Sequence, residues 1–200
     1  MSKLFTSTQV GPYRLSHRVV MAPLTRMRSD PGDIPSDLMV KYYTQRASDG
    51  GLIVSEATPV STRGNGYAGA PGIYSDTQIA GWRRVADAVH AKGGRIFQQL
   101  WHVGRQSHVD LQPDGEAPVA PSAIAAEGYA YTKRGEAPFS MPRARELHEI
   151  PASSRSSDPA PRGQRVRVST ASRSTARTAT CPINSCRTGP TSARTSTAAR

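Results

Sequence analysis

Three short apolar runs in this chain each end beside a polar side chain that could bind a ligand. The runs are residues 18–22, 52–54 and 95–100. A hydroxyl (Thr25) follows the first run, a carboxylate (Glu56) follows the second, and an amide (Gln99) lies in the third. Short runs rich in β-branched residues are typical of buried strands. If these strands are parallel, their ends meet at one edge of a sheet, where α/β enzymes bind ligands.

Two helical patterns separate the runs. Ser36 is the expected N-cap of a helix that continues to Arg46 or Ala47, and Asp76 is the expected cap of a second helix that Gly93–Gly94 ends. The residues expected to face the core are Leu38, Met39, Tyr42 and Tyr43 in the first helix, and Ile79, Trp82, Val85 and Val89 in the second. The order strand, helix, strand, helix, strand favours parallel strands with helical crossovers.

The remaining segments predict turns and loops. Gly11–Pro12 is expected to join two short strands, and the Gly-rich segment 58–75 and the segment 106–140 are expected to be loops. No G-x-G-x-x-G motif follows the first run, which weighs against a dinucleotide-binding Rossmann unit. The pattern alone does not separate an open sheet from a barrel.

Composition divides the chain in two. The 200 residues are 36% hydrophobic, with a mean hydropathy of −0.51 and a net charge of +11. Residues 151–200 contain nine arginines, one acidic residue and no aromatic residue, so they carry +8 of that charge. An Arg-rich tail could bind nucleic acid. We favour disorder instead, because the tail is poor in apolar residues and has no aromatic or Gly-rich recognition pattern.

Other composition signals point to a cytoplasmic protein without a metal or a membrane anchor. No run approaches the roughly 18 apolar residues of a membrane span, and the N-terminus has no apolar signal-peptide core. Cys181 and Cys186 have no His or carboxylate neighbours that would complete a zinc site. His102 and His108 likewise lack further ligands at suitable spacing, so we expect structural roles for them.

Several motifs of residues 1–150 resemble, in the same order, those of the Old Yellow Enzyme family of FMN-dependent NAD(P)H:ene reductases. They are RVVMAPLTR at 18–26, YYTQRA at 42–47, SEAT at 55–58, GY at 66–67, QLWHVGR at 99–105 and PVAPS at 118–122. The resemblance implies a (β/α)8 barrel that binds FMN at its C-terminal rim. For this chain the expected fold is α/β, a partial TIM barrel of three or so βα units.

The resemblance also implies roles for individual residues. Thr25 would hydrogen-bond the O4 edge of the flavin, and Gln99 would face its pyrimidine end, because an amide both donates and accepts. Residues expected to line the isoalloxazine ring are Pro23, Leu24 and Ala57, and those expected to shape the substrate pocket are Tyr67 and Trp101. Without the resemblance, the residues themselves favour structural roles, such as a turn hydroxyl for Thr25 and core for Trp101.

The implied reaction is a hydride relay. NAD(P)H reduces FMN, and flavin N5 then passes hydride to the β-carbon of an α,β-unsaturated carbonyl or nitro compound, while the protein orients and polarises the substrate. In the family a His/Asn or His/His pair and a Tyr proton donor lie in a later segment, F-D-G-V-E-V-H-G-A-N-G-Y-L. That segment is absent from this sequence, so no catalytic residue is predicted.

The tail nevertheless carries a trace of the missing segment. The family stretch, written in GC-rich codons and read one base later, gives the residues from Ser169 onward. We therefore hypothesise a frame shift shortly after Ile150 or Pro151, which places Thr175, Thr178 and Thr180 where His, Asn and Tyr would be coded. Residues 1–150 would then be the N-terminal part of a flavin barrel and 151–200 a disordered tail.

Such a chain is expected to be inactive or weakly active. About 150 residues cannot close a barrel that takes roughly 250, and the open edge of the third strand would favour aggregation. Two alternatives remain at this point: a barrel remnant without a function of its own, and a nucleic-acid-binding protein that uses the arginine-rich tail.

Overall fold

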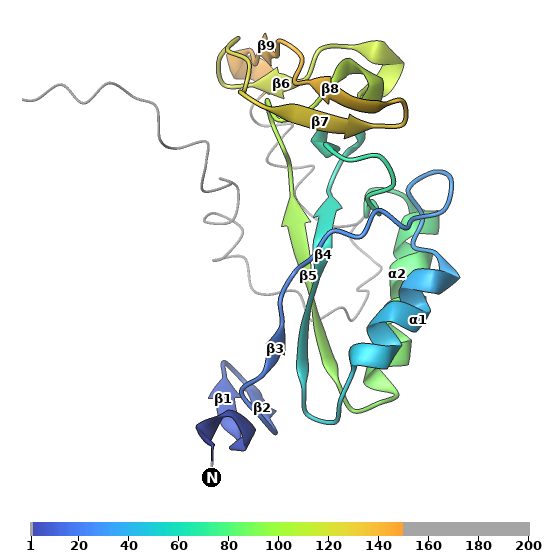
Figure 1. The fold of residues 1–200 in the computed structure, drawn as a ribbon, viewed down its shortest axis with the longest axis vertical. Coiled ribbons are helices and arrows are strands. Elements are labelled where there is room, and N and C mark those ends of the chain that lie inside the picture. Colours follow the sequence, from blue (N-terminus) through green and yellow to red (C-terminus); the bar gives the residue numbers. More distant parts are fainter. Residues whose placement is uncertain (1, 150–200) are drawn as a thin grey trace, which may run out of the picture.

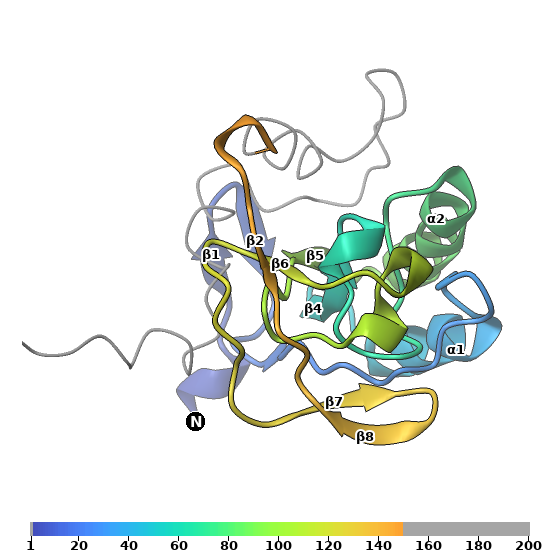
Figure 2. The ribbon, with the colours of Figure 1, turned by 90° about the horizontal axis from the view of Figure 1, so that it is seen from above.

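The computed structural model describes residues 2–149. At its centre is a three-stranded parallel sheet in the order β3–β4–β5, whose strands are Val20–Met21, Leu52–Pro59 and Arg95–Trp101. Helices α1 (Asp37–Arg46) and α2 (Asp76–His90) form the crossovers, and both lie on one side of β4 and β5 (Figures 1 and 2). The predicted mixed α/β partial barrel is therefore confirmed. The predicted tail, with Thr175, Thr178 and Thr180, lies outside the described residues.

The core lies between the sheet and the two helices. Its fully buried members are Met39 and Tyr43 from α1, Trp82, Val85, Ala86 and Val89 from α2, and Ile53 and Ile96 from the sheet. All four predicted inner residues of α2 are buried. In α1 the prediction is wrong for Leu38, which is 57% exposed, because α2 and the sheet cover only the opposite part of that helix.

A serine caps the N-terminus of each helix. The Ser36 side chain accepts a hydrogen bond from the backbone N–H of Met39, as predicted. For α2 the predicted cap, Asp76, is wrong, and Ser75 takes that place. Gln78 stands three residues after Ser75, and the two side chains form a reciprocal capping box. Asp76 is the first helical residue, where its charge is favourable to the helix dipole.

The first strand of the sheet is shorter and less buried than expected. A buried strand was predicted over residues 18–22, but β3 covers only Val20–Met21, and Val19 and Val20 are 48% and 42% exposed. The cause is topological, because β3 pairs with β4 alone among the described strands. Residues that would be enclosed in a closed barrel lie here at an edge.

A hairpin lies near the N-terminal end of the sheet. Strands β1 (Thr8–Val10) and β2 (Tyr13–Leu15) pair antiparallel across Gly11–Pro12, as predicted. The Tyr13 ring contacts Phe97 of β5 edge-on, with ring centroids 5.7 Å apart. Since Phe97 lies between the core residue Ile96 and Gln98 along β5, this contact is on the sheet face opposite the helices.

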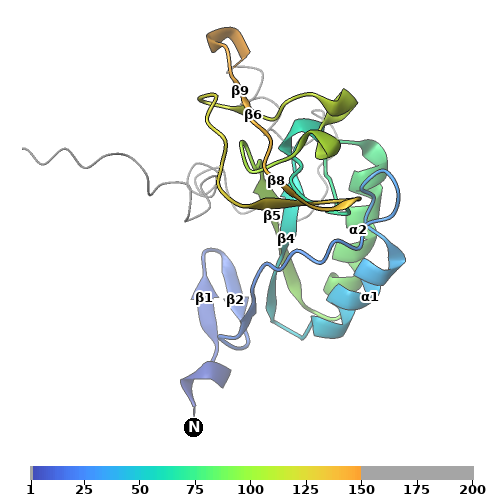
Figure 3. The same ribbon diagram turned by 45° about the horizontal axis from the view of Figure 1, so that its top comes forward.

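The segment 106–140 is not the plain loop that was expected. It contains β6 (Val119–Ala120), which pairs with β9 (Arg143–Ala144), and an antiparallel hairpin of β7 (Tyr129–Thr132) and β8 (Gly135–Pro138). These strands lie beyond the C-terminal ends of β4 and β5 (Figures 1 and 3). Short 3-10 turns complete the fold at Lys3–Phe5, Thr62–Gly64, Val109–Leu111, Pro113–Gly115 and Leu147–Glu149. Within residues 2–149, no helix has the length and apolar character that crossing a membrane requires.

Candidate functional site

A β-bulge in β4 decides which side chains face the candidate site. Val54 pairs with Phe97 and Ala57 with Gln99, so two residues, Ser55 and Glu56, lie opposite one residue of β5. Beyond the bulge, Ala57 and its register partner point to the same face. That face is the one opposite the helices, because the Glu56 carboxylate, one residue earlier, reaches Tyr43 of α1.

The three strand ends converge, as the sequence predicted. The backbone N–H of Arg26 donates to Glu56 Oε2 at 3.1 Å, which places the loop carrying Thr25 beside the end of β4. Thr25 is partly buried, and Pro23 and Leu24 are exposed. Glu56 lies at this rim as predicted, and the bulge turns its carboxylate toward α1, where it also contacts Tyr43.

The two predicted pocket aromatics lie against each other. Tyr67 and Trp101 stack with ring centroids 5.6 Å apart. Gly66 permits the approach of this loop, because a Cβ there would lie 2.7 Å from Val103 Cγ1. Sequence reasoning missed a third ring, Tyr131, whose centroid is 6.2 Å from that of Tyr67. The alternation Tyr129–Thr132, flanked by glycines, was the signal that could have identified this strand.

Three polar groups at the converging strand ends have the chemistry to bind a flavin ring. Among residues 2–149, neither the Thr25 hydroxyl nor the Gln99 side-chain amide hydrogen-bonds to another protein group. The Trp101 indole N–H is buried and has no partner within that range either. A hydroxyl and an amide can both donate and accept, which matches the alternating C=O and N–H edge of the flavin. The resemblance assigns the FMN phosphate to later strands, so the fit concerns the ring alone.

Glu56 and Tyr43 form a buried pair behind this face, which the sequence did not reveal. They are 1% and 0% exposed. Tyr43 Oη donates to Glu56 Oε1 at 3.1 Å and accepts from the Glu56 backbone N–H at 2.8 Å. Burial raises the pKa of the Glu56 carboxyl, and hydrogen bonds from Arg26 N–H and Tyr43 act in the opposite direction. Burial, with the nearby Glu56 charge, raises the pKa of Tyr43.

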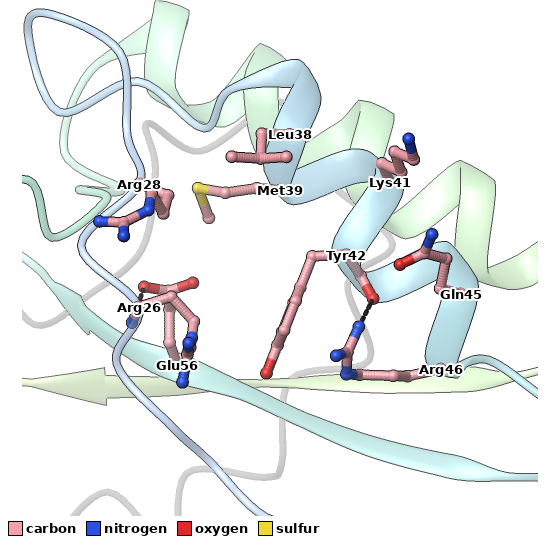
Figure 4. A pocket seen from close by; sticks show the side chains of 9 residues that line it. All are labelled: Arg26, Arg28, Leu38, Met39, Lys41, Tyr42, Gln45, Arg46 and Glu56. Carbon is pink, nitrogen blue, oxygen red and sulfur yellow. Dashed lines mark hydrogen bonds between the residues drawn. The ribbon is translucent and has the colours of Figure 1, made fainter.

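Two cavities lie beside α1 and β3, and the first also borders the loop carrying Thr25 at Arg26. One, of about 260 Å³, is lined by α1 and reaches Glu56 (Figure 4). Among its lining residues, the Arg46 guanidinium lies 3.8 Å from the centroid of the Tyr42 ring. The other, of about 400 Å³, is lined by apolar residues that include Val19 and Val20 and by the polar residues His17, Arg46 and Ser48. None of the seven predicted flavin or pocket residues lines either cavity.

His102 immediately follows Trp101, and its environment keeps it neutral. Burial, followed by the charge of Arg145, lowers the pKa of His102 to about 4. Its Nδ1 accepts a hydrogen bond from the backbone N–H of Gly104 at 3.1 Å, which requires that nitrogen to be unprotonated. The ring therefore fixes the turn that follows β5.

Comparison with known proteins identifies a family for most of the described residues. The family model described as the NADH:flavin oxidoreductase / NADH oxidase family matches residues 3–141. Flavin oxidoreductase hxnT of Emericella nidulans is 46% identical over 156 residues, which cover 74% of this chain and 40% of that protein. 12-Oxophytodienoate reductase 7 of Oryza sativa subsp. japonica is 51% identical over 117 residues, which cover 58% and 29%.

Solved structures agree with the relatives. Morphinone reductase in complex with tetrahydroNAD matches with a TM-score of 0.71 and 52% identity, over 78% of this chain and 44% of that chain. The Old Yellow Enzyme homologue from Zymomonas mobilis matches with a TM-score of 0.72 and 44% identity, over 78% and 43%. The chain thus spans about two fifths of the length of the hxnT relative.

Proposed function

Because this chain belongs to the NADH:flavin oxidoreductase / NADH oxidase family of FMN-dependent oxidoreductases, we propose that it forms the flavin-ring face of an ene reductase. The reductant would be NAD(P)H and the substrate a small α,β-unsaturated carbonyl or nitro compound. The proposal depends mainly on one observation. The side chains of Thr25 and Gln99 lie at converging strand ends and make no hydrogen bond to another group within residues 2–149. Flavin oxidoreductases and oxophytodienoate reductases among the relatives support the same chemistry.

Each residue of this face would have a simple task. The Thr25 hydroxyl would donate to the O4 edge of the flavin, and the Gln99 amide would bind its pyrimidine end. Ala57 leaves room for the ring to lie flat against β4, because its side chain is a single methyl group. Tyr67 and Trp101 would exclude water from the space above the ring. Bound FMN would supply the hydride chemistry, which no side chain can provide.

We further propose that the 200-residue chain alone has little or no ene-reductase activity. Within residues 2–149 the sheet has three strands, whereas a closed (β/α)8 barrel has eight. A flavin on an open sheet would remain largely in water, where hydrogen bonds from the protein stabilise it less. The residues that would polarise the substrate are also missing from the sequence.

Reconstitution tests this proposal. The full chain would be titrated with FMN, with flavin fluorescence as the readout, alone and mixed with a separate polypeptide that contains the remaining βα units of morphinone reductase. We expect weak binding alone, and binding with reduction of cyclohexenone in the mixture. Thr25→Val and Gln99→Leu should weaken FMN binding in the mixture by about tenfold each, the loss of one hydrogen bond. Lys92→Gln, in the exposed turn after α2, is the control.

Two results would contradict it. A purified chain that retained FMN and reduced cyclohexenone by itself would disprove the predicted inactivity. A mixture that bound FMN equally well with Thr25→Val and Gln99→Leu would disprove the assignment of the flavin face.

A further inference from the structure

We propose that Glu56 is a positioning residue, whose buried carboxylate holds the loop that carries Thr25 against the flavin face. This inference rests on the function proposed above. The side chain is 1% exposed, although a carboxylate is seldom buried without strong partners. The groups that bind the Glu56 carboxylate therefore indicate its role.

Those partners are backbone groups of the Thr25 loop. Glu56 Oε2 accepts from the N–H of Arg26 at 3.1 Å, and the Met27 N–H also interacts with the carboxylate. The Arg26 side chain is exposed, and no ion pair joins it to Glu56 among the described residues. The carboxylate thus binds the peptide that follows Thr25, while Tyr43 fixes its other oxygen at 3.1 Å.

The loop itself needs such support. Met27 has a φ of 53°, in the left-handed region that a non-glycine residue seldom adopts. A conformation of this kind is unfavourable and persists only where surrounding contacts determine it. The other contacts of this segment include the N–H of Ser29, which donates to the carbonyl of Gly69 at 3.2 Å. Without the carboxylate, the part of the loop nearest Thr25 loses its anchor.

Glu56 is also adjacent in sequence to a residue of the flavin face. Ala57, which points to that face, follows Glu56 directly, and Gln99 pairs with Ala57 in register. Glu56 therefore fixes the distance between the end of β4 and the loop after β3. Thr25 and Gln99 can both hydrogen-bond to one planar ring only if that distance is constant.

The test compares amide hydrogen exchange of the full chain with that of two variants. Glu56→Leu fills the same volume without an acceptor, and Glu56→Gln keeps a neutral acceptor that can face Arg26. We expect Glu56→Leu to lower the protection of the Arg26 and Met27 amides by about 10- to 100-fold relative to the Ile96 amide. Glu56→Gln should restore most of it. Ile53→Val, in the same strand and core, is the control and should not change that ratio.

A second readout reports on the flavin. In the complex reconstituted with the morphinone reductase polypeptide, Glu56→Leu should weaken FMN binding about tenfold or more and shift the flavin reduction potential, and Glu56→Gln should reverse both. A merely structural defect would not be reversed by the neutral amide. If Glu56→Leu does not fold, Tyr43→Phe, which frees one carboxylate oxygen, should raise exchange at Arg26 several-fold.

The outcomes separate the two proposals. Unchanged exchange at Arg26 and Met27 in a folded variant overturns the role of Glu56, whatever the flavin does. Unchanged FMN affinity and potential in the Glu56→Leu complex overturn its positioning role at the flavin. Increased exchange combined with a wild-type complex that binds no FMN supports the anchoring of the loop and overturns the proposed function.

Discussion

Tyr67 and Trp101 lie face to face, with ring planes inclined by only 16°. Tyr67 also stacks with Tyr131 at an angle of 18°, and a parallel β-bridge joins the backbones of these two tyrosines. The rings thus connect β5, the Gly-rich loop and the β7–β8 hairpin. One wall of the proposed substrate pocket depends on a hairpin far along the sequence.

Removing the third ring should loosen that hairpin. An aromatic pair contributes about 0.5–1.5 kcal/mol beyond its buried area, so Tyr131→Ala should speed tryptic cleavage after Lys133 or Arg134 by roughly three- to tenfold. Tyr129→Ala is the matched control, because Tyr129 is on the same strand, is 63% exposed and has no ring partner among the described residues. Equal cleavage rates in the two variants would show that the stack does not hold the hairpin.

The capping box at the start of α2 should stabilise the whole domain. Ser75→Ala removes the acceptor for the Gln78 backbone N–H and should lower the free energy of unfolding by about 1 kcal/mol. Urea denaturation measures the change. Ser61→Ala provides the comparison, because Ser61 precedes a 3-10 turn without a side-chain capping bond. A loss for Ser61→Ala as large as that for Ser75→Ala would argue against capping as the cause.

His102 should make the fold sensitive to acid. Its pKa is about 4 in the folded chain against 6.5 for the free side chain, so between these values the unfolded chain binds the extra proton. Its contribution to stability is complete above pH 6.5 and is lost as the pH falls through about 4. The maximum loss corresponds to about 3 kcal/mol.

His102→Asn isolates this effect. The Asn side-chain carbonyl can accept the hydrogen bond from the Gly104 N–H, as His102 Nδ1 does, but it does not titrate. Urea denaturation at pH 7, 6, 5 and 4 should show the wild type losing stability relative to the variant. Because Glu56 titrates in both proteins, its contribution cancels when their free energies of unfolding are subtracted. Two parallel curves would mean that His102 is protonated equally in the folded and unfolded chains.

The exposed edge at β3 should promote self-association. Edge strands with apolar side chains are sites of aggregation, and a lysine there opposes pairing with another chain. Val19→Lys should therefore reduce light scattering of concentrated samples, with little effect on the urea midpoint. Val10→Lys serves as the reference, since Val10 is 41% exposed but lies in the β1–β2 hairpin. An equal reduction by both substitutions would indicate a general effect of charge.

Local signals were sufficient to predict the helices and the strand order. Ser36 and the spacing of Trp82, Val85 and Val89 are local sequence features. In the folded chain, Ser36 caps its helix and the three α2 residues are buried, as predicted. The parallel topology followed from the alternation of strands and helices, and it predicted the meeting of Thr25, Ala57 and Gln99. The assignment of these residues to a flavin came from the resemblance and stays a prediction.

Features that depend on long-range partners could not be predicted. Val19 and Val20 have the composition of a buried strand, but their exposure depends on which strands lie beside them. The β7–β8 hairpin was missed, although Tyr129–Thr132 has a strand-like alternation, because its turn, Lys133–Arg134, lacks the Asn-Gly or Asp-Gly signal. Nothing local indicated the bulge that turns the Glu56 carboxylate toward α1.

That bulge also makes one position of β4 tolerant of a change in length. Ser55 and Glu56 share the place opposite Gln98, so loss of Ser55 would restore regular pairing and leave both faces of the strand as they are. Loss of a residue after the bulge would instead exchange the two faces, placing the Glu56 charge toward the flavin side and Ala57 toward the helices. A single-residue gap in a homologous chain is therefore compatible with this architecture at Ser55 and not at Thr58.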